Sequence, residues 1–143
     1  MHIPIQISSE LPDERVVRSF GILSTFPPTS CGIATFSAAL AAGLVAEGLS
    51  VDVVRCGPPP PMEDAPLEDA MVLASLDPLD GRGSDAALAV LNASDVAIIQ
   101  HEYGLYDGRD GVSILALMAR LTVPTMVVAH TVVGDPSASQ RYI

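Results

Sequence analysis

The chain has 143 residues, 49% of them hydrophobic, so it is long and apolar enough to bury the core of one globular domain. Its 17 carboxylates against 7 basic residues give a formal net charge of −10, which argues against a nucleic-acid-binding face built from clustered positive charge. All seven basic residues are arginine, which excludes a Schiff-base lysine and the lysine of a phosphate-binding P-loop within this chain.

The first elements of the chain are a leader, a strand and a rigid loop. Residues 1–15 mix polar residues with proline and are expected to lie outside the core. The run 16–23 is rich in β-branched and large apolar residues, which predicts a strand. The segment 24–30 contains two consecutive prolines, and because proline fixes φ it is expected to form a loop.

A helix and a second strand are expected next. The helix begins at Gly32 and ends near Gly48, and its apolar residues fall at helical spacing: Ile33, Phe36, Leu40 and Leu44. The second strand is expected at 50–55. Four consecutive prolines at 58–61 then predict an extended surface loop.

The rest of the chain continues the alternation of strands and helices. Strands are expected at 71–73, 95–100 and 124–129, and helices at 84–91 and 112–121. Such an order predicts an α/β domain with a doubly wound, Rossmann-like parallel sheet, strand order about 3-2-1-4-5, covered by helices on both faces.

The last twelve residues, 132–143, are expected to form a loop and the first turn of a helix, with Asp135 or Ser137 as its cap. A helix that stops after one turn leaves the fifth strand at a bare sheet edge, which natural domains avoid. We therefore expect residues 16–143 to be an incomplete N-terminal domain of a longer protein.

Polar and glycine-containing segments follow three of the expected strands. They are residues 27–32 after the first strand, 100–106 after the fourth and 130–131 after the fifth. In open α/β sheets, ligands bind beyond the carboxyl ends of the strands, near the point where the strand order reverses. We expect these three segments to converge on one crevice.

Cys31, Gly32 and Ile33 stand at the start of the first helix. Backbone N–H groups and the helix dipole favour an anion there, above all a phosphate. The alternative is that Gly32 only permits a tight turn and close packing. The sequence lacks a G-x-G-x-x-G pattern, so a dinucleotide-binding fingerprint is absent.

Histidine and other polar residues end the fourth and fifth strands. His130, followed by Thr131, can hydrogen-bond a substrate or act as acid or base near neutral pH, or it can be satisfied by the backbone. His101, Glu102 and Tyr103 suit the recognition of hydroxyl groups. A metal site would need further ligands beside His101 and Glu102, so none is expected.

Two cysteines, Cys31 and Cys56, are too few for a disulfide framework or a zinc site. Cys31 paired with a histidine has no identifiable third residue to orient it, which disfavours a cysteine hydrolase. We expect Cys56 to be a packing residue. No signal-peptide pattern precedes the domain and no apolar run approaches the roughly 20 residues of a membrane span, so we expect a cytoplasmic protein.

Three motifs together carry a resemblance to a known family. They are Ser24-Thr25-Phe26-Pro27-Pro28 with Cys31-Gly32-Ile33-Ala34-Thr35-Phe36, Gln100-His101-Glu102-Tyr103-Gly104, and His130-Thr131-Val132. In this order and at these strand ends, they resemble the N-terminal domain of family 4 retaining glycosyltransferases, which have the two-domain GT-B fold.

The resemblance implies transfer of a sugar from a nucleotide-diphosphate sugar to an acceptor with retention of configuration, without a metal ion or other cofactor. It places the glycine loop, Cys31 to Ile33, near the donor diphosphate and His130 near the transferring sugar. It places His101, Glu102, Tyr103 and Thr131 along the acceptor cleft. The partners implied are the nucleotide sugar, an unknown acceptor and the protein's own C-terminal domain.

The C-terminal domain of that family, which holds most of the nucleotide, has no counterpart in these 143 residues. We therefore expect the isolated chain to be inactive, because stabilising the leaving-group charge is usually the largest catalytic contribution. Two alternatives stay open: a non-catalytic α/β binding or regulatory module, and another GT-B nucleotide-sugar enzyme, such as a 2-epimerase or a phosphorylase.

Overall fold

The computed structural model describes residues 16–57 and 72–142. Within them, five strands form one parallel sheet in the order β3-β2-β1-β4-β5. The strands are β1 (Ser19–Ser24), β2 (Ser50–Cys56), β3 (Val72–Leu76), β4 (Val96–His101) and β5 (Thr125–Ala129). This confirms the expected fold class and strand order. The expected leader at 1–15 and the proline loop at 58–61 lie outside the described residues.

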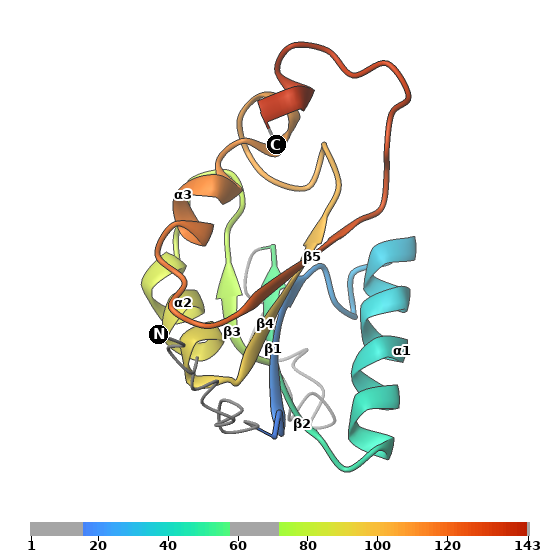
Figure 1. Ribbon diagram of the computed structural model, residues 1–143, viewed down its shortest axis with the longest axis vertical. Coiled ribbons are helices and arrows are strands. Elements are labelled where there is room, and N and C mark those ends of the chain that lie inside the picture. The colour runs from blue at the N-terminus through green and yellow to red at the C-terminus, as the bar shows by residue number, and fades with distance from the viewer. Residues whose placement is uncertain (1–15, 58–71, 143) are drawn as a thin grey trace, which may run out of the picture.

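Helices cover both faces of the sheet, as expected for a doubly wound fold. Helix α1 (Gly32–Ala46) lies on one face, and α2 (Ser84–Ala93) and α3 (Ile114–Met118) lie on the other (Figure 1). Two single 3₁₀ turns, η1 (Arg109–Gly111) and η2 (Gln140–Tyr142), lie in the loops after β4 and β5. None of the helices in the described ranges has the length and apolar character needed to cross a membrane.

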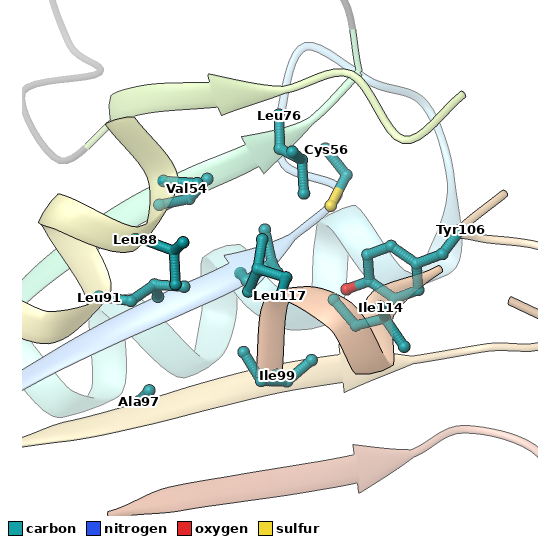
Figure 2. Close-up of a cluster of buried hydrophobic side chains, with 12 residues drawn as sticks. Val54, Cys56, Leu76, Leu88, Leu91, Ala97, Ile99, Tyr106, Ile114 and Leu117 are labelled. Carbon is teal, nitrogen blue, oxygen red and sulfur yellow. The ribbon is translucent and has the colours of Figure 1, made fainter. Parts of the chain in front are cut away.

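The larger apolar cluster fills the space between the sheet and the helices α2 and α3. Figure 2 shows side chains from both layers in this cluster, among them Val54, Ile99, Leu88, Leu91, Ile114 and Leu117. Burying one such side chain contributes about 1.5–3 kcal/mol. All six residues of β4 are buried, which is typical of a central parallel strand. The core therefore holds the carboxyl end of β4 in a fixed position.

Helix α1 packs on the other face through small residues. The helical spacing of the apolar residues predicted the helix, but its buried residues are Ala34, Ser37 and Ala41, whereas Phe36 is 46% exposed. Small side chains allow a helix to approach a sheet closely, and here the Oγ atoms of Ser37 and Ser24 lie 2.6 Å apart. This close packing leaves Phe36 at the surface, one turn into the helix.

Helix α3 is shorter than the ten residues expected at 112–121. Asp110 and Gly111 adopt positive φ values of 58° and 82°, so the chain turns just before the helix. The bonds at its two ends run from residue i to residue i−3, as in the bond from Leu121 N to Met118 O at 3.1 Å. This pattern tightens the flanking turns into 3₁₀ geometry and leaves one turn of α-helix.

Candidate functional site at the carboxyl edge of the sheet

The segments that follow β4 and β5 lie together at the carboxyl edge of the sheet. The backbone N–H of His130 donates to the carbonyl oxygen of His101 at 2.9 Å, which continues the β4–β5 pairing by one bond. The Thr131 hydroxyl donates to Glu102 Oε2 at 2.7 Å. The expected meeting of these two segments is therefore seen, and it is held by both backbone and side-chain bonds.

Helix α1 reaches the same edge through Phe36. The rings of Phe36 and His130 meet edge to face, with their centroids 5.3 Å apart and an interplanar angle of 87°. Edge-to-face contacts are a preferred arrangement of aromatic rings. His130, which is half-buried, thus lies between the sheet and the second turn of α1.

Gln100 fixes the ring of His130. The two side chains are joined by a hydrogen bond of 2.7 Å between Gln100 Oε1 and His130 Nε2. A carbonyl oxygen only accepts, so Nε2 carries the hydrogen and the Nδ1 atom of a neutral ring is left as an acceptor. Gln100 is fully buried, and its main-chain carbonyl oxygen accepts from the Tyr106 hydroxyl at 2.8 Å. The amide Nε2 of Gln100 is also buried and has no hydrogen-bond partner among the described residues.

Cys31 is the N-cap of α1 and is exposed. Its Sγ accepts from the N–H of Ala34 at 3.4 Å and lies 3.3 Å from Thr25 Oγ1. The hydrogen bond from Thr25, followed by those from the backbone, lowers the pKa of Cys31 below its ordinary value, although partial burial opposes them. The thiol therefore ionises more readily than a free cysteine does.

Gly32 begins α1 without any structural need for glycine. Its φ is not positive, and a Cβ atom added to it would meet nothing within 4 Å in the described part of the chain. The alternative explanation of Gly32, a tight turn and close packing, has no support among these residues. The N–H of Ala34 is bound by Cys31 Sγ, and the lack of a side chain at Gly32 leaves the start of the helix accessible to a ligand.

His101 lies on the opposite face of the sheet from Gln100, because neighbouring residues of a strand point to opposite faces. It is 6% exposed and touches the rings of Tyr103 and Tyr106. Burial lowers the pKa of His101, and the Glu102 carboxylate opposes that effect. Among the described residues its Nε2 has no hydrogen-bond partner.

Three of the four residues expected along the acceptor cleft line one cavity. His101, Tyr103 and Thr131 lie at a hollow of about 300 Å³ beside α3, and Glu102 is joined to it by its bond with Thr131. His130 lies on the α1 face instead. Among the described residues, no hydrogen bond or ring contact joins His130 to residues 31–33. The expected single crevice thus has two parts, one on each face of the sheet edge.

The sequence assigned no role at this edge to three residues: Arg55, and Phe36 and Gln100, which stand in the quoted motifs. Arg55 is 4% exposed and stands beside Ser24 in the β1–β2 register. Strand alternation puts it on the α1 face, and no carboxylate of the described residues lies within ion-pair distance of it. A polar residue at the end of an otherwise buried strand was the signal that could have identified Arg55 and Gln100.

Within residues 16–57 and 72–142, no group of three or more His, Cys, Asp or Glu side chains could hold a metal ion. Comparison of the chain with protein-family models, with curated proteins and with solved structures yields no match.

Proposed function

We propose that this domain is the acceptor-side half of a retaining glycosyltransferase that uses a nucleotide-diphosphate sugar. The observation that carries the proposal is the placement of His130, held by Gln100 and Phe36, at the carboxyl edge of the sheet beside the second turn of α1. Ligands of open α/β sheets bind at this edge. The three sequence motifs that resemble family 4 enzymes supply its residues.

In the proposed reaction, the bond between the anomeric carbon and the diphosphate oxygen breaks, and the diphosphate leaves with the electron pair. The acceptor oxygen forms the new bond on the same face of the sugar, and its proton passes to the leaving diphosphate. The open first turn at Gly32 offers N–H groups to the growing negative charge, and the buried Arg55 guanidinium on the same face adds a positive one.

His130 would position the donor sugar. With Nε2 bound to Gln100, a neutral ring accepts a hydrogen bond at Nδ1 from a sugar hydroxyl. The contact with Phe36 restricts rotation of the ring. In this proposal, the bond from Gln100 keeps His130 in one tautomer before the substrate binds, so that no reorganisation is needed during the reaction.

The proposed reaction needs a nucleotide sugar and an acceptor but no metal ion. In enzymes of the resembled family, a second domain holds most of the nucleotide. We therefore expect the 143-residue chain alone to bind a donor weakly and to transfer no sugar, since it lacks most of the charge needed to stabilise the diphosphate.

The test is sugar transfer by the complete gene product that contains this chain. It is incubated with labelled UDP-, GDP- and ADP-sugars and a panel of hydroxyl acceptors, and the anomeric configuration of the product is determined by NMR. We expect retention, and we expect His130→Ala to lower kcat/KM by about 10²–10⁴-fold. A product of inverted configuration, epimerised nucleotide sugar without transfer, or full activity in His130→Ala would refute the proposal.

A further inference from the structure

The cavity beside α3 has a composition that restricts its ligand. Its volume of about 300 Å³ is at the lower end of the range for small-molecule sites. Nine of its thirteen lining residues are apolar; those from α3 are Ile114, Leu115 and Met118, and those from the loop after β5 include Val132. Strands β4 and β5 contribute the other apolar lining residues, Ile99, Val127 and Ala129, so the lining of the cavity is mostly apolar.

The polar lining is neutral. It consists of His101, Tyr103, Thr131 and Gln140, and no Asp, Glu, Arg or Lys contributes to it. An anionic ligand would lose its hydration there without gaining a counter-charge, which is unfavourable. The Glu102 carboxylate, which accepts a hydrogen bond from Thr131 of the lining, would also repel an anion. A nucleotide sugar is thus unsuited to this cavity.

Thr131 gives the cavity a defined hydrogen-bonding character. Its hydroxyl proton is donated to Glu102 Oε2, so its oxygen can still accept a hydrogen bond from a ligand. His101 also lines this end of the cavity, but its Nε2, which has no partner among the described residues, is covered and not accessible to a ligand. A ligand hydroxyl can donate to the Thr131 oxygen, and so it suits this end of the cavity.

We infer that this cavity binds the acceptor substrate, and that the acceptor is a neutral amphipathic alcohol whose hydroxyl lies at the Thr131 end and whose apolar part packs against α3. That the ligand is an acceptor substrate rests on the proposed function. Its chemical class rests only on the residues that line the cavity. The donor diphosphate and the acceptor then occupy opposite faces of the same sheet edge, the first charged and the second neutral.

Binding of three probes to the 143-residue chain tests the inference. They are 1-octanol, octanoate, which has the same chain length but is anionic, and glycerol, which has hydroxyls but no apolar part. Methyl signals in ¹H–¹³C NMR spectra report binding, with Leu115 and Val132 at the cavity and Leu88, which does not line it, as the reference. We expect saturable shifts with octanol only at the cavity, at least tenfold weaker binding of octanoate, and no shifts with glycerol.

Two variants locate the site. Ala129 is exposed on β5 and lines the cavity, so Ala129→Leu should fill it and weaken octanol binding at least tenfold. Ala89→Leu, at an exposed position of α2, is the matched control and should leave binding unchanged. Val132→Asp, at a residue that is 84% exposed, is a second variant that should also weaken binding without loss of folding.

Octanoate binding as tightly as octanol, glycerol shifting the same methyl signals, or unchanged octanol binding in folded Ala129→Leu and Val132→Asp would each overturn the inference. Its failure differs from that of the proposed function. If the chain binds octanol but the gene product transfers no sugar, the inferred ligand class is supported and the proposed glycosyltransferase function is contradicted. If the protein transfers sugar to polar acceptors but does not bind octanol, the proposed function is supported and the inferred ligand class is contradicted.

Discussion

The side-chain carbonyl of Gln100 and the ring of His130 form one unit, with 2.7 Å between Oε1 and Nε2. Gln100 is fully buried, which restricts the rotation of its side chain, and its amide Nε2 has no hydrogen-bond partner among the described residues. The tautomer of His130 is thereby set by a residue in the core, and the core in turn depends on the packing of α2 and α3 on the sheet.

Gln100→Leu should allow both neutral tautomers of His130 to be populated, because it removes the hydrogen bond to Nε2 and keeps the ring. Long-range ¹H–¹⁵N NMR spectra at pH 8 should show a hydrogen on Nε2 in the wild-type chain and a mixture of tautomers in the variant. Gln140→Leu changes the same residue type outside this bond and should leave the spectrum of His130 as it is. If Gln100→Leu keeps the wild-type tautomer, Gln100 does not position His130.

Replacing Gly32 should separate stability from function. Nothing lies within 4 Å of a Cβ atom at Gly32 in the described chain, so Gly32→Ala should keep or raise the free energy of unfolding, by up to about 1 kcal/mol. In the proposed site the added methyl group meets the diphosphate instead. We expect kcat/KM of the complete gene product to fall at least tenfold, measured beside urea unfolding of the chain.

Gly43 provides the matched control for this substitution. It lies in the interior of the same helix, is exposed, and also has open space around a Cβ atom. Gly43→Ala should stabilise the chain by about 0.5–1 kcal/mol and leave transfer unchanged. Equal activity of the two variants would contradict the proposed role of the first turn of α1 in binding the diphosphate.

The alternation of strands and helices could be predicted from the sequence because each strand of this sheet is a short apolar run and α1 and α2 have apolar residues at helical spacing. The strand order then followed from the rules for parallel sheets. The length of α3 could not be predicted, because the positive φ values at Asp110 and Gly111 and the 3₁₀ bonding after them depend on the local backbone.

The site was predicted in part. The residues at the strand ends were identified, but not the face on which each lies: His101 points toward α3, whereas Gln100 and His130 lie on the α1 side. The spacing of Phe36 in the sequence predicts that it lies on the apolar, buried face of the helix. In the structure the small residues Ala34, Ser37 and Ala41 pack on the sheet instead, and Phe36 lies beside His130. Which of several apolar residues is buried depends on how closely the layers approach.

The two thiols should differ strongly in reactivity. The hydrogen bond from Thr25 lowers the pKa of Cys31, whereas burial raises the pKa of Cys56 to about 12. Because the thiolate is the nucleophile, one thiol per folded chain should react with Ellman's reagent at pH 7.5, and Cys31→Ser should abolish this reaction. Cys56 should react only after unfolding. Two thiols that react at equal rates in the folded chain would contradict the burial of Cys56.

Thr25→Val tests the cause of the lowered pKa of Cys31. Without the hydroxyl that lies 3.3 Å from Sγ, the pKa should rise and the reaction at pH 7.5 should slow severalfold. Thr29→Val, an exposed change in the same loop, is the control and should leave the rate unchanged. A rate in Thr25→Val equal to that of the wild type would assign the reactivity to the helix terminus alone.

His101 should make the stability of the domain depend on pH. Burial holds its pKa in the folded state below the ordinary value of 6.5, so the unfolded chain binds a proton first as the pH falls. The contribution of neutral His101 is fully present above pH 6.5 and is lost as the pH falls from 6.5 toward the lower pKa of the folded state. The free energy of unfolding should therefore decrease between pH 7 and pH 5.

His101→Phe should flatten this dependence, because it keeps an aromatic ring beside Tyr103 and Tyr106 and removes the titrating group. Urea unfolding at pH 8, 7, 6 and 5 measures how the free energy of unfolding changes with pH in the wild type and in the variant. A constant difference in this free energy, caused by repacking of the new ring near Gly111, does not affect the comparison of the two pH dependences. Carboxylates titrate in both proteins alike, and only the difference between the two slopes is attributed to His101. Parallel curves over the whole range would mean that His101 is protonated as easily in the folded chain as in the unfolded one.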